Sequence, residues 1–195
     1  MKSSRKASIC RALVASAKKQ FLLASEDAIS IAPYSPSPMS MVHGVWERLS
    51  EEITRNDYVV ELGCGDARWI IAAVERFACS AMGVEWDVEV AKMAMERTKD
   101  KGLQDAIEIR IQDMLARDFC LPKDTTIVIV YAFANTLNVN IKALLMQCKP
   151  NTRVISVGFH VQGWHPKWTQ RYGGLCCYYY DALDGQKAGI GDSKR

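Results

Sequence analysis

Two hydrophobic periods alternate along the chain, and together they predict an α/β domain. Short apolar or alternating runs predict strands at residues 58–62, 81–84, 107–112, 126–131, 153–159 and 175–180. Between them, apolar residues at three- and four-residue spacing predict helices at 68–77, 88–101 and 137–148. Gly102 and the pair Lys149-Pro150 supply helix stops. Strands that alternate with helices are typical of a parallel sheet that has helices on both faces.

Two of the predicted strands indicate where the edge and the centre of this sheet lie. Residues 107–112 alternate strictly between apolar and polar side chains, which is typical of an edge strand. Residues 126–131 are apolar almost throughout, as expected for a strand that is covered on both faces. We therefore expect 58–62 and 126–131 at the centre, with the sheet continuing outward in both directions.

The two ends of the chain differ from the predicted domain, which we place at residues 31–183. Residues 1–25 carry six basic side chains and no acidic one, and Ile9, Leu13, Ala17 and Phe21 recur at four-residue spacing. The N-terminal segment, residues 1–30, therefore fits a mitochondrial targeting peptide, an amphipathic helix or a solvated tail. Residues 184–195 lack an apolar period and predict a flexible tail.

Charge and cysteine usage disfavour several classes of function. Beyond residue 25 the chain holds 19 basic and 22 acidic side chains, so it lacks the basic face that a nucleic-acid backbone favours. Seven cysteines without a Cys-x-x-Cys pair, and three histidines without helical ligand spacing, indicate neither a disulfide framework nor a metal site. No apolar run reaches the roughly 18 residues of a membrane helix.

The strongest chemical signal is Glu61-Leu62-Gly63-Cys64-Gly65-Asp66, at a predicted strand-to-helix turn. Glycines at Gly63 and Gly65 let a ligand approach the backbone at the carboxyl edge of the sheet. A dinucleotide fingerprint would have a third glycine where Arg68 stands. Carboxylates at Glu61 and Asp66 would repel a pyrophosphate but suit the ammonium and sulfonium of S-adenosyl-L-methionine. This is the expected cofactor.

Two more acids follow the next two strands. Glu85 ends the second strand, 24 residues after Glu61, where a carboxylate can accept both ribose hydroxyls. Asp113 ends the third, beside Met114, where an adenine amino group needs an acceptor and an apolar wall. A single acid at a strand end is commonly a solvated cap. Acids at three successive strand ends favour cofactor binding.

With these residues the chain resembles class I S-adenosylmethionine-dependent methyltransferases, and within them a smaller group. It is similar to the mitochondrial protein-lysine methyltransferases that modify the adenine nucleotide carrier and the ATP synthase c subunit, and to their bacterial relatives. The resemblance covers about residues 34–181 and rests on Tyr34-Ser35-Pro36-Ser37, Gly63-Cys64-Gly65-Asp66-Ala67-Arg68, Gln112-Asp113-Met114, Arg153-Val154-Ile155-Ser156, Trp164-His165-Pro166 and Tyr180-Asp181.

The resemblance implies a Rossmann-like, mostly parallel, seven-stranded sheet and methyl transfer to a protein lysine. It also places Tyr34 at the cofactor. Ala67 departs from the family's usual glycine, and a proline normally found near Ala134 is missing. The family's hydrophobic membrane-anchoring segment is absent as well. Because the loop near Ala134 faces the target in such enzymes, the substrate of this chain can differ.

For the methyl acceptor we expect Tyr131 and Asn135 to line the catalytic site, with Tyr34, Ser37 and Asn138 as further candidates to orient an amine. The Asp/Asn-Pro-Pro-aromatic signature of nucleic-acid amino-methyltransferases is missing after residue 131. A small-molecule or RNA methyltransferase and a non-catalytic S-adenosylmethionine-binding module remain alternatives. A nicotinamide dehydrogenase is the least favoured. The N-terminal segment favours a mitochondrial location, with the cytoplasm as the alternative.

Overall fold

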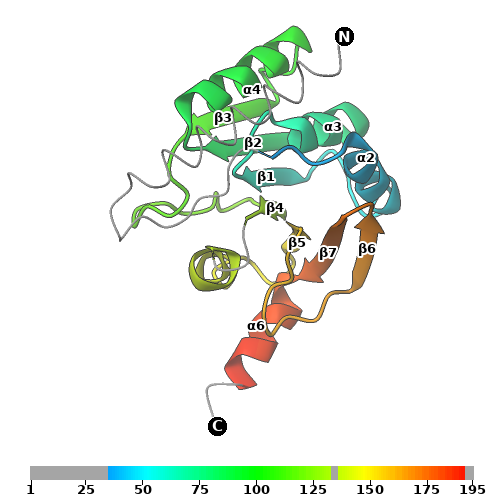
Figure 1. The fold of residues 1–195 in the computed structure, drawn as a ribbon, viewed down its shortest axis with the longest axis vertical. Helices are drawn as coiled ribbons and strands as arrows, with labels where there is room; N and C mark the ends of the chain where they lie inside the picture. The colour runs from blue at the N-terminus through cyan, green and yellow to red at the C-terminus, as the bar shows by residue number, and fades with distance from the viewer. Residues whose placement is uncertain (1–34, 133–135, 192–195) are drawn as a thin grey trace, which may run out of the picture. The chain divides into compact units, whose positions relative to one another are not determined.

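The computed structural model describes residues 35–132 and 136–191. Within these ranges, seven strands form one sheet in the order β3-β2-β1-β4-β5-β7-β6 (Figure 1). The strands are β1 (Tyr58–Leu62), β2 (Ser80–Glu85), β3 (Ile107–Ile111), β4 (Ile127–Tyr131), β5 (Arg153–Val157), β6 (Trp168–Tyr172) and β7 (Leu175–Asp181). Neighbours among β1 to β5 pair in parallel, and β7 pairs antiparallel with β5 and β6. The predicted sheet is confirmed, with β3 at an edge and β1 and β4 at the centre.

The helices between β1 and β4 follow the predicted pattern, and those after β4 depart from it. They are α2 (Met39–Arg48), α3 (Arg68–Phe77), α4 (Val88–Asp100), η1 (Thr136–Ile141), α5 (Lys142–Leu145) and α6 (Ala182–Gly191). Asp87 begins α4 by accepting hydrogen bonds from the amides of Glu89 and Val90. The helix predicted for residues 137–148 is a π-helix, η1, followed by one α-helical turn. The four-residue apolar spacing was still visible in the sequence because Leu137, Ile141 and Leu145 are all buried.

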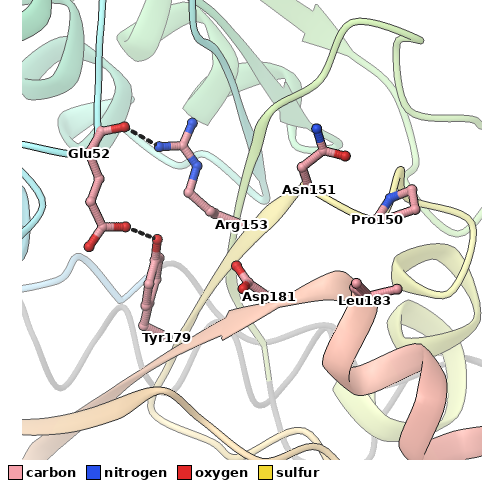
Figure 2. A pocket seen from close by; sticks show the side chains of 7 residues that line it. All are labelled: Glu52, Pro150, Asn151, Arg153, Tyr179, Asp181 and Leu183. Carbon is pink, nitrogen blue, oxygen red and sulfur yellow. Dashed lines mark hydrogen bonds between the residues drawn. The ribbon is translucent and has the colours of Figure 1, made fainter.

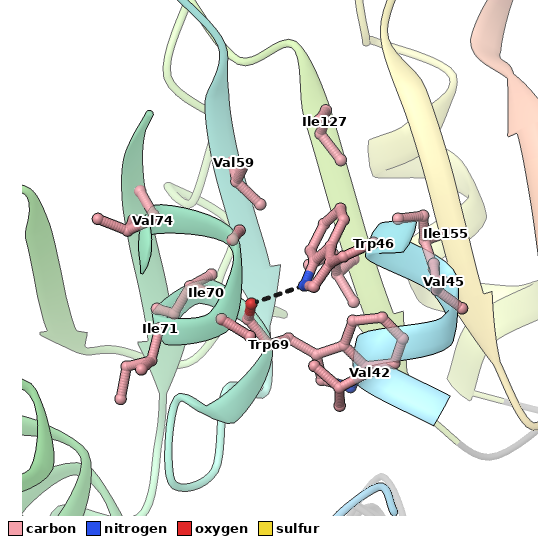
Figure 3. Packing of buried hydrophobic residues seen from close by; sticks show 14 of the residues in the cluster. Val42, Val45, Trp46, Val59, Trp69, Ile70, Ile71, Val74, Ile127 and Ile155 are labelled. Carbon is pink, nitrogen blue, oxygen red and sulfur yellow. Dashed lines mark hydrogen bonds between the residues drawn. The ribbon is translucent and has the colours of Figure 1, made fainter. Parts of the chain in front are cut away.

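The sheet has a separate core on each face, because successive side chains of a strand point to opposite sides. One core, packed against α2, α3 and α4, includes Val59, Ile127 and Ile155 (Figure 3). There the indole nitrogen of Trp46 donates to the carbonyl oxygen of Trp69 at 3.0 Å and joins α2 to α3. The other core, packed against η1, α5 and the start of α6, includes Val60, Val128 and Val154.

Two elements that the sequence pattern did not predict, α2 and β6, contact each other. The guanidinium of Arg48 lies 4.6 Å from the centre of the Trp168 ring. Gly44 lies against Tyr172, so closely that a Cβ there would be 2.7 Å from Cε1 of the ring. The residues of β6 alternate between partly buried and exposed, without a fully buried position. Because β6 lies at the sheet edge and has no fully buried position, it lacks the apolar run of an interior strand.

Residues 184–191, which we predicted as the start of a flexible tail, belong to α6. Gly185 packs against Trp164, where an added Cβ would lie 2.0 Å from the ring. The side-chain amide of Gln186 donates to the carbonyl oxygens of Met146 and Cys148, at 3.1 and 2.8 Å. A helix held by a glycine contact and by polar bonds leaves no apolar period in the sequence.

The parallel strands β1 to β5 end at one edge of the sheet, which is where sheets of this kind bind ligands. The predicted cofactor residues that the structure describes all lie at or directly after these strand ends. Among the helices within the described ranges, none is long and apolar enough to cross a membrane.

Candidate active site

The turn between β1 and α3 adopts left-handed backbone at three positions. The φ angle is 72° at Gly63, 55° at Gly65 and 60° at Ala67. The amides of Gly63 and Cys64 donate to the carbonyl oxygen of Val84, at 2.9 and 3.0 Å, and hold the turn against the end of β2. Ala67 takes the position of the family's usual glycine. It adopts a left-handed conformation that costs residues other than glycine, alanine included, about 1–2 kcal/mol. The glycines leave bare backbone at the carboxyl edge.

Gly83, in β2, provides the space in which this turn packs. A Cβ on Gly83 would lie 2.6 Å from Sγ of Cys64 and 3.0 Å from Cδ1 of Ile109. Cys64 is buried, and this burial, followed by the charges of Glu61 and Glu85, raises the pKa of its thiol well above the ordinary value of 9.0. The glycine two residues before Glu85 therefore has a packing role.

Glu85 joins the loops that follow β1 and β2. Its side chain is buried, and one carboxylate oxygen accepts a hydrogen bond from the amide of Gly65 at 3.0 Å. The other oxygen accepts from the amides of Trp86 and Asp87, at 3.0 and 3.1 Å. Three backbone donors thus fix the carboxylate beside the glycine turn, where it can also accept hydroxyl groups of a ligand.

Glu61 is the most buried acid at this edge. One of its oxygens, Oε2, has no hydrogen-bond partner among the residues that the structure describes. Desolvation, followed by the negative charge of Asp66, raises the pKa of Glu61 well above the ordinary value of 4.5. A buried acceptor of this kind is costly unless a donor reaches it. The site therefore fits a ligand that brings a positively charged donor.

Asp66, which we expect to contact the cofactor, bonds to two guanidinium groups. Its carboxylate accepts from Nε and Nη2 of Arg68, at 2.8 and 2.7 Å, and from Arg97 of α4. Arg68 also donates to the carbonyl oxygen of Ser37 at 2.5 Å, and the Ser37 hydroxyl accepts from the indole of Trp69 at 3.0 Å. The two guanidinium groups thus offset the negative charge of Asp66. The repulsion that we expected between Asp66 and a pyrophosphate is therefore weakened.

The residues after β2 and β3 offer an apolar surface beside Glu85. Met114 approaches the turn, with its Cε 3.9 Å from the position that a Cβ on Gly63 would take. Asp113 is exposed, and its carboxylate accepts from the amide of Leu115 at 2.8 Å, as a local turn residue does. Trp86, directly after Glu85, is 53% exposed. Sequence reasoning missed Trp86, although a large aromatic beside the acid was the available signal.

Tyr131 ends β4 on the same face of the sheet as Glu61. In the parallel register Glu61 lies opposite Ile129, and Tyr131 is two residues further on. Its ring lies against Gly158, where φ is 85° and an added Cβ would be 3.1 Å from Cε2. The structure thus brings Tyr131 to the edge that carries the acids. Tyr34 and Asn135 lie outside the described residues.

Asn138 does not offer a free amide to an amine. Its side chain donates to the carbonyl oxygen of His160 at 3.3 Å and accepts from the amide of Gln162 at 2.7 Å. Across the described ranges, no three His, Cys, Asp or Glu side chains are grouped to hold a metal ion.

Comparison with known proteins identifies the family. The model of the ANTKMT methyltransferase domain matches residues 61–168, more than half of the chain. The chain belongs to this family. It is also 31% identical over 136 residues to a protein-lysine N-methyltransferase of Saccharolobus islandicus (strain REY15A), a match that covers 69% of this chain and 81% of that protein.

Solved structures of methyltransferases share the fold of this ANTKMT-domain protein. An RNA methyltransferase from Salinibacter ruber in complex with S-adenosyl-L-homocysteine is 26% identical, with a TM-score of 0.68, and the match covers 76% of this chain and 94% of that one. A geranyl diphosphate C-methyltransferase from Streptomyces coelicolor A3(2), 20% identical, has a TM-score of 0.51 over 61% of this chain and 43% of that one. The predicted class I methyltransferase fold is confirmed.

Family membership confirms the enzyme class and the cofactor that the sequence predicted. The ANTKMT-domain protein is an S-adenosyl-L-methionine-dependent methyltransferase. The unpartnered oxygen of Glu61 fits the ammonium group of this cofactor. The individual cofactor contacts remain predictions.

A hollow of about 320 Å³ lies at the opposite edge of the sheet, where β5 begins (Figure 2). The Tyr179 hydroxyl donates to Glu52 at 2.6 Å, and Arg153 donates to the carbonyl oxygen of Glu52 at 2.6 Å. Burial, followed by the hydrogen bond to Glu52, raises the pKa of Tyr179. These polar groups bond to one another. They lie at the end of the sheet where the parallel strands begin, whereas Glu85 lies where they end, so we assign the hollow no part in methyl transfer.

Proposed function

We propose that this ANTKMT-domain enzyme transfers a methyl group to the side-chain amine of a protein lysine. The observation that carries the proposal is the 31% identity to the protein-lysine N-methyltransferase of Saccharolobus islandicus, over 81% of that protein. The sequence after Tyr131 lacks the Asp/Asn-Pro-Pro-aromatic run of nucleic-acid amino-methyltransferases, which supports a methyl acceptor other than a nucleic-acid base.

For the cofactor, we propose that five side chains at the carboxyl edge make the main contacts. S-adenosyl-L-methionine, when bound, supplies a methyl group on a positively charged sulfur. The unpartnered oxygen of Glu61 would accept a hydrogen bond from the ammonium group, and the carboxylate of Glu85 would accept hydrogen bonds from the ribose hydroxyls. Trp86 and Met114 would cover the two faces of the adenine, and Asp113 would accept its amino group. Gly63 and Gly65 would allow the close approach, with Asp66 holding the turn.

On the acceptor side, this chain has to favour the neutral amine. Removing the proton from a lysine of pKa 10.4 costs about 4.6 kcal/mol at pH 7. A partly apolar surface lowers that cost because it disfavours the ammonium form. We propose that Tyr131 contributes this surface and a hydroxyl that orients the amine, because it shares a sheet face with Glu61. Asn135 and Tyr34 remain proposed members of the site.

An RNA substrate is the second candidate, because the RNA methyltransferase from Salinibacter ruber is 26% identical to this chain and the match covers 94% of its length. Against it stands the excess of acidic over basic side chains beyond residue 25. A small-molecule acceptor and a chain that only binds the cofactor complete the alternatives.

The test is transfer of tritium from labelled S-adenosyl-L-methionine into a whole-cell extract. The proposal expects label in the protein fraction and its recovery as methyl-lysine after acid hydrolysis. Label in the RNA fraction alone would reject a lysine target, and label in small molecules alone would favour the small-molecule alternative. Retained binding of S-adenosyl-L-homocysteine without transfer to any fraction would favour the non-catalytic module. Glu85→Ala serves as the inactive control.

The location of the enzyme is proposed from its basic N-terminal segment. Residues 1–25 fit a mitochondrial targeting peptide in composition. Fusion of these residues to a fluorescent reporter is expected to direct it to mitochondria. A diffuse cytosolic signal would reject the mitochondrial location.

A further inference from the structure

The segment after β5, residues 158–163, lies beside the end of β4. Tyr131, the last residue of β4, is opposite Val157 in the parallel register. The next residue, Gly158, turns the chain with a φ of 85°, and its amide donates to the carbonyl oxygen of Cys176 at 2.7 Å. We call residues 158–163 the β5 loop. The Tyr131 ring packs against the first residue of this loop, Gly158.

Side chains from three other elements and from β5 hold the backbone of the β5 loop. From β5, the Ser156 hydroxyl donates to the carbonyl oxygen of Phe159 at 2.7 Å. From β7, the Tyr180 hydroxyl accepts from the amide of Val161 at 3.1 Å. From α5, the Lys142 ammonium donates to the carbonyl oxygen of Gln162 at 2.7 Å. The conformation of the loop therefore depends on particular side chains.

Asn138 of η1 makes two of these bonds and joins both ends of a three-residue stretch. Its amide oxygen accepts from the amide of Gln162, and its amide nitrogen donates to the carbonyl oxygen of His160. A side chain with only a donor or only an acceptor cannot make both. π-helices such as η1 occur frequently at functional sites. Here the π-helix places Asn138 opposite the β5 loop.

We propose that Asn138 is a positioning residue of the methyl-transfer site. By holding the β5 loop against η1, it fixes the position of Gly158, against which the Tyr131 ring packs. The inference rests on the proposed function, because it assigns the Tyr131 side of the edge to the acceptor amine. Methyl transfer requires the amine, the methyl carbon and the sulfur to align, and a displacement of about 1 Å can lower a rate by about a hundredfold. Loss of Asn138 therefore impairs transfer to the acceptor and leaves the cofactor loops unchanged.

The experiment compares Asn138→Leu, which removes both bonds, with Asn138→Asp, which keeps the acceptor for Gln162. Asn140→Leu is the matched control, because Asn140 lies in the same π-helix and, within the described ranges, its side chain makes no hydrogen bond to the β5 loop. Three quantities are measured: exchange of the Gln162 amide hydrogen by NMR, the affinity for S-adenosyl-L-homocysteine by calorimetry, and tritium transfer into extract protein.

Asn138→Leu is expected to accelerate Gln162 exchange and to slow transfer, each by at least about tenfold, with the affinity within about twofold of the starting protein. Asn138→Asp is expected to retain most of the protection and transfer, and Asn140→Leu all of both. Should Asn138→Leu not fold, Lys142→Met removes another bond to Gln162, and the same two readouts are expected to change about two- to fivefold.

Normal transfer in a variant that has lost Gln162 protection would overturn the positioning role. A parallel loss of S-adenosyl-L-homocysteine affinity would do the same, because it would reveal a general structural defect. Failure of the starting protein to label any protein lysine would instead reject the proposed function, and this inference with it. The exchange measurement distinguishes the two failures, since it needs no acceptor.

Discussion

The two halves of the carboxyl edge are held together by different kinds of bond. The loops after β1 and β2 join mostly through main-chain groups, because Gly63 and Cys64 donate to the carbonyl oxygen of Val84. One side chain takes part as well, since the carboxylate of Glu85 accepts from the amide of Gly65. The loops after β4 and β5 join through side chains of Asn138 and Lys142. Main-chain bonds tolerate substitution, whereas side-chain bonds depend on residue identity. The cofactor half can thus stay constant while the acceptor half changes its substrate.

Replacing Glu85 should break the cofactor half most strongly. In Glu85→Ala, we expect the affinity for S-adenosyl-L-homocysteine to fall at least about a hundredfold, because hydrogen bonds to charged groups contribute about 1.5–3 kcal/mol each. Calorimetry measures the change. Glu89→Ala is the control, because that exposed carboxylate pairs with Lys92 on the surface of α4. An affinity within about threefold of the starting protein would contradict the ribose role of Glu85.

A single methyl group at Gly83 tests whether packing holds the cofactor loop in place. Gly83→Ala should lower the free energy of unfolding by about 1–3 kcal/mol and weaken S-adenosyl-L-homocysteine binding about tenfold, because the new Cβ would overlap Cys64. Urea unfolding and calorimetry measure the two effects. Gly174→Ala, with no heavy atom within 4 Å of the new Cβ, should stay within about 0.5 kcal/mol. Equal effects in the two variants would refute this view.

A matched pair of left-handed glycines tests the acceptor half. Gly158 and Gly173 both have positive φ, but only at Gly158 does the added Cβ meet the Tyr131 ring. Each alanine variant should lose about 1–3 kcal/mol of stability through backbone strain. Gly158→Ala alone should slow tritium transfer to protein, by about fivefold, while S-adenosyl-L-homocysteine affinity is retained. Equal transfer rates in the two variants would remove Tyr131 from the acceptor site.

The smallest expected effect is a proton released by Glu61. Because the pKa of Glu61 is raised in the folded protein, the unfolded chain ionises first as pH rises above 4.5. The free energy of unfolding therefore falls with pH until the folded-state pKa is passed, and is constant above it. A ligand ammonium favours the ionised carboxylate, so S-adenosyl-L-homocysteine should release up to about one proton per site below that pKa.

Calorimetry in two buffers with different ionisation enthalpies measures this proton. Glu61→Gln should bind without the release and should lose the pH dependence of stability that Glu61 causes. Equal proton release in Glu61→Gln and in the starting protein would assign the proton to another group.

The difference between the halves also explains what the sequence could predict. β1, α3 and the end of β2 were predicted closely, because Tyr58–Leu62 is mostly buried and apolar apart from Glu61, and its turn needs local glycines. Asn138 was expected to orient an amine, and its bonds to the β5 loop were missed. Its partners His160 and Gln162 lie more than twenty residues away, and no local pattern indicates them. Arg97 was missed for the same reason, since it pairs with Asp66 across α4 and the turn.

Elements whose burial is one-sided were the other omission. β6 is covered on one face by α2, and α6 is held by Gly185 and Gln186, so neither leaves an apolar period. The π-helix could not be predicted either. Its apolar residues keep a spacing that an α-helix also has, and the backbone hydrogen bonds that distinguish a π-helix leave no mark in the sequence.

Cys64 has a chemical consequence for an enzyme that handles an alkylating agent. A thiolate is the most reactive nucleophile among ordinary side chains, and this sulfur belongs to the loop that approaches the methyl donor. Burial, followed by the charges of Glu61 and Glu85, raises the pKa of this thiol and so disfavours its thiolate form. A sulfur atom can therefore fill the tight space beside Gly83 with a lowered tendency to act as a nucleophile.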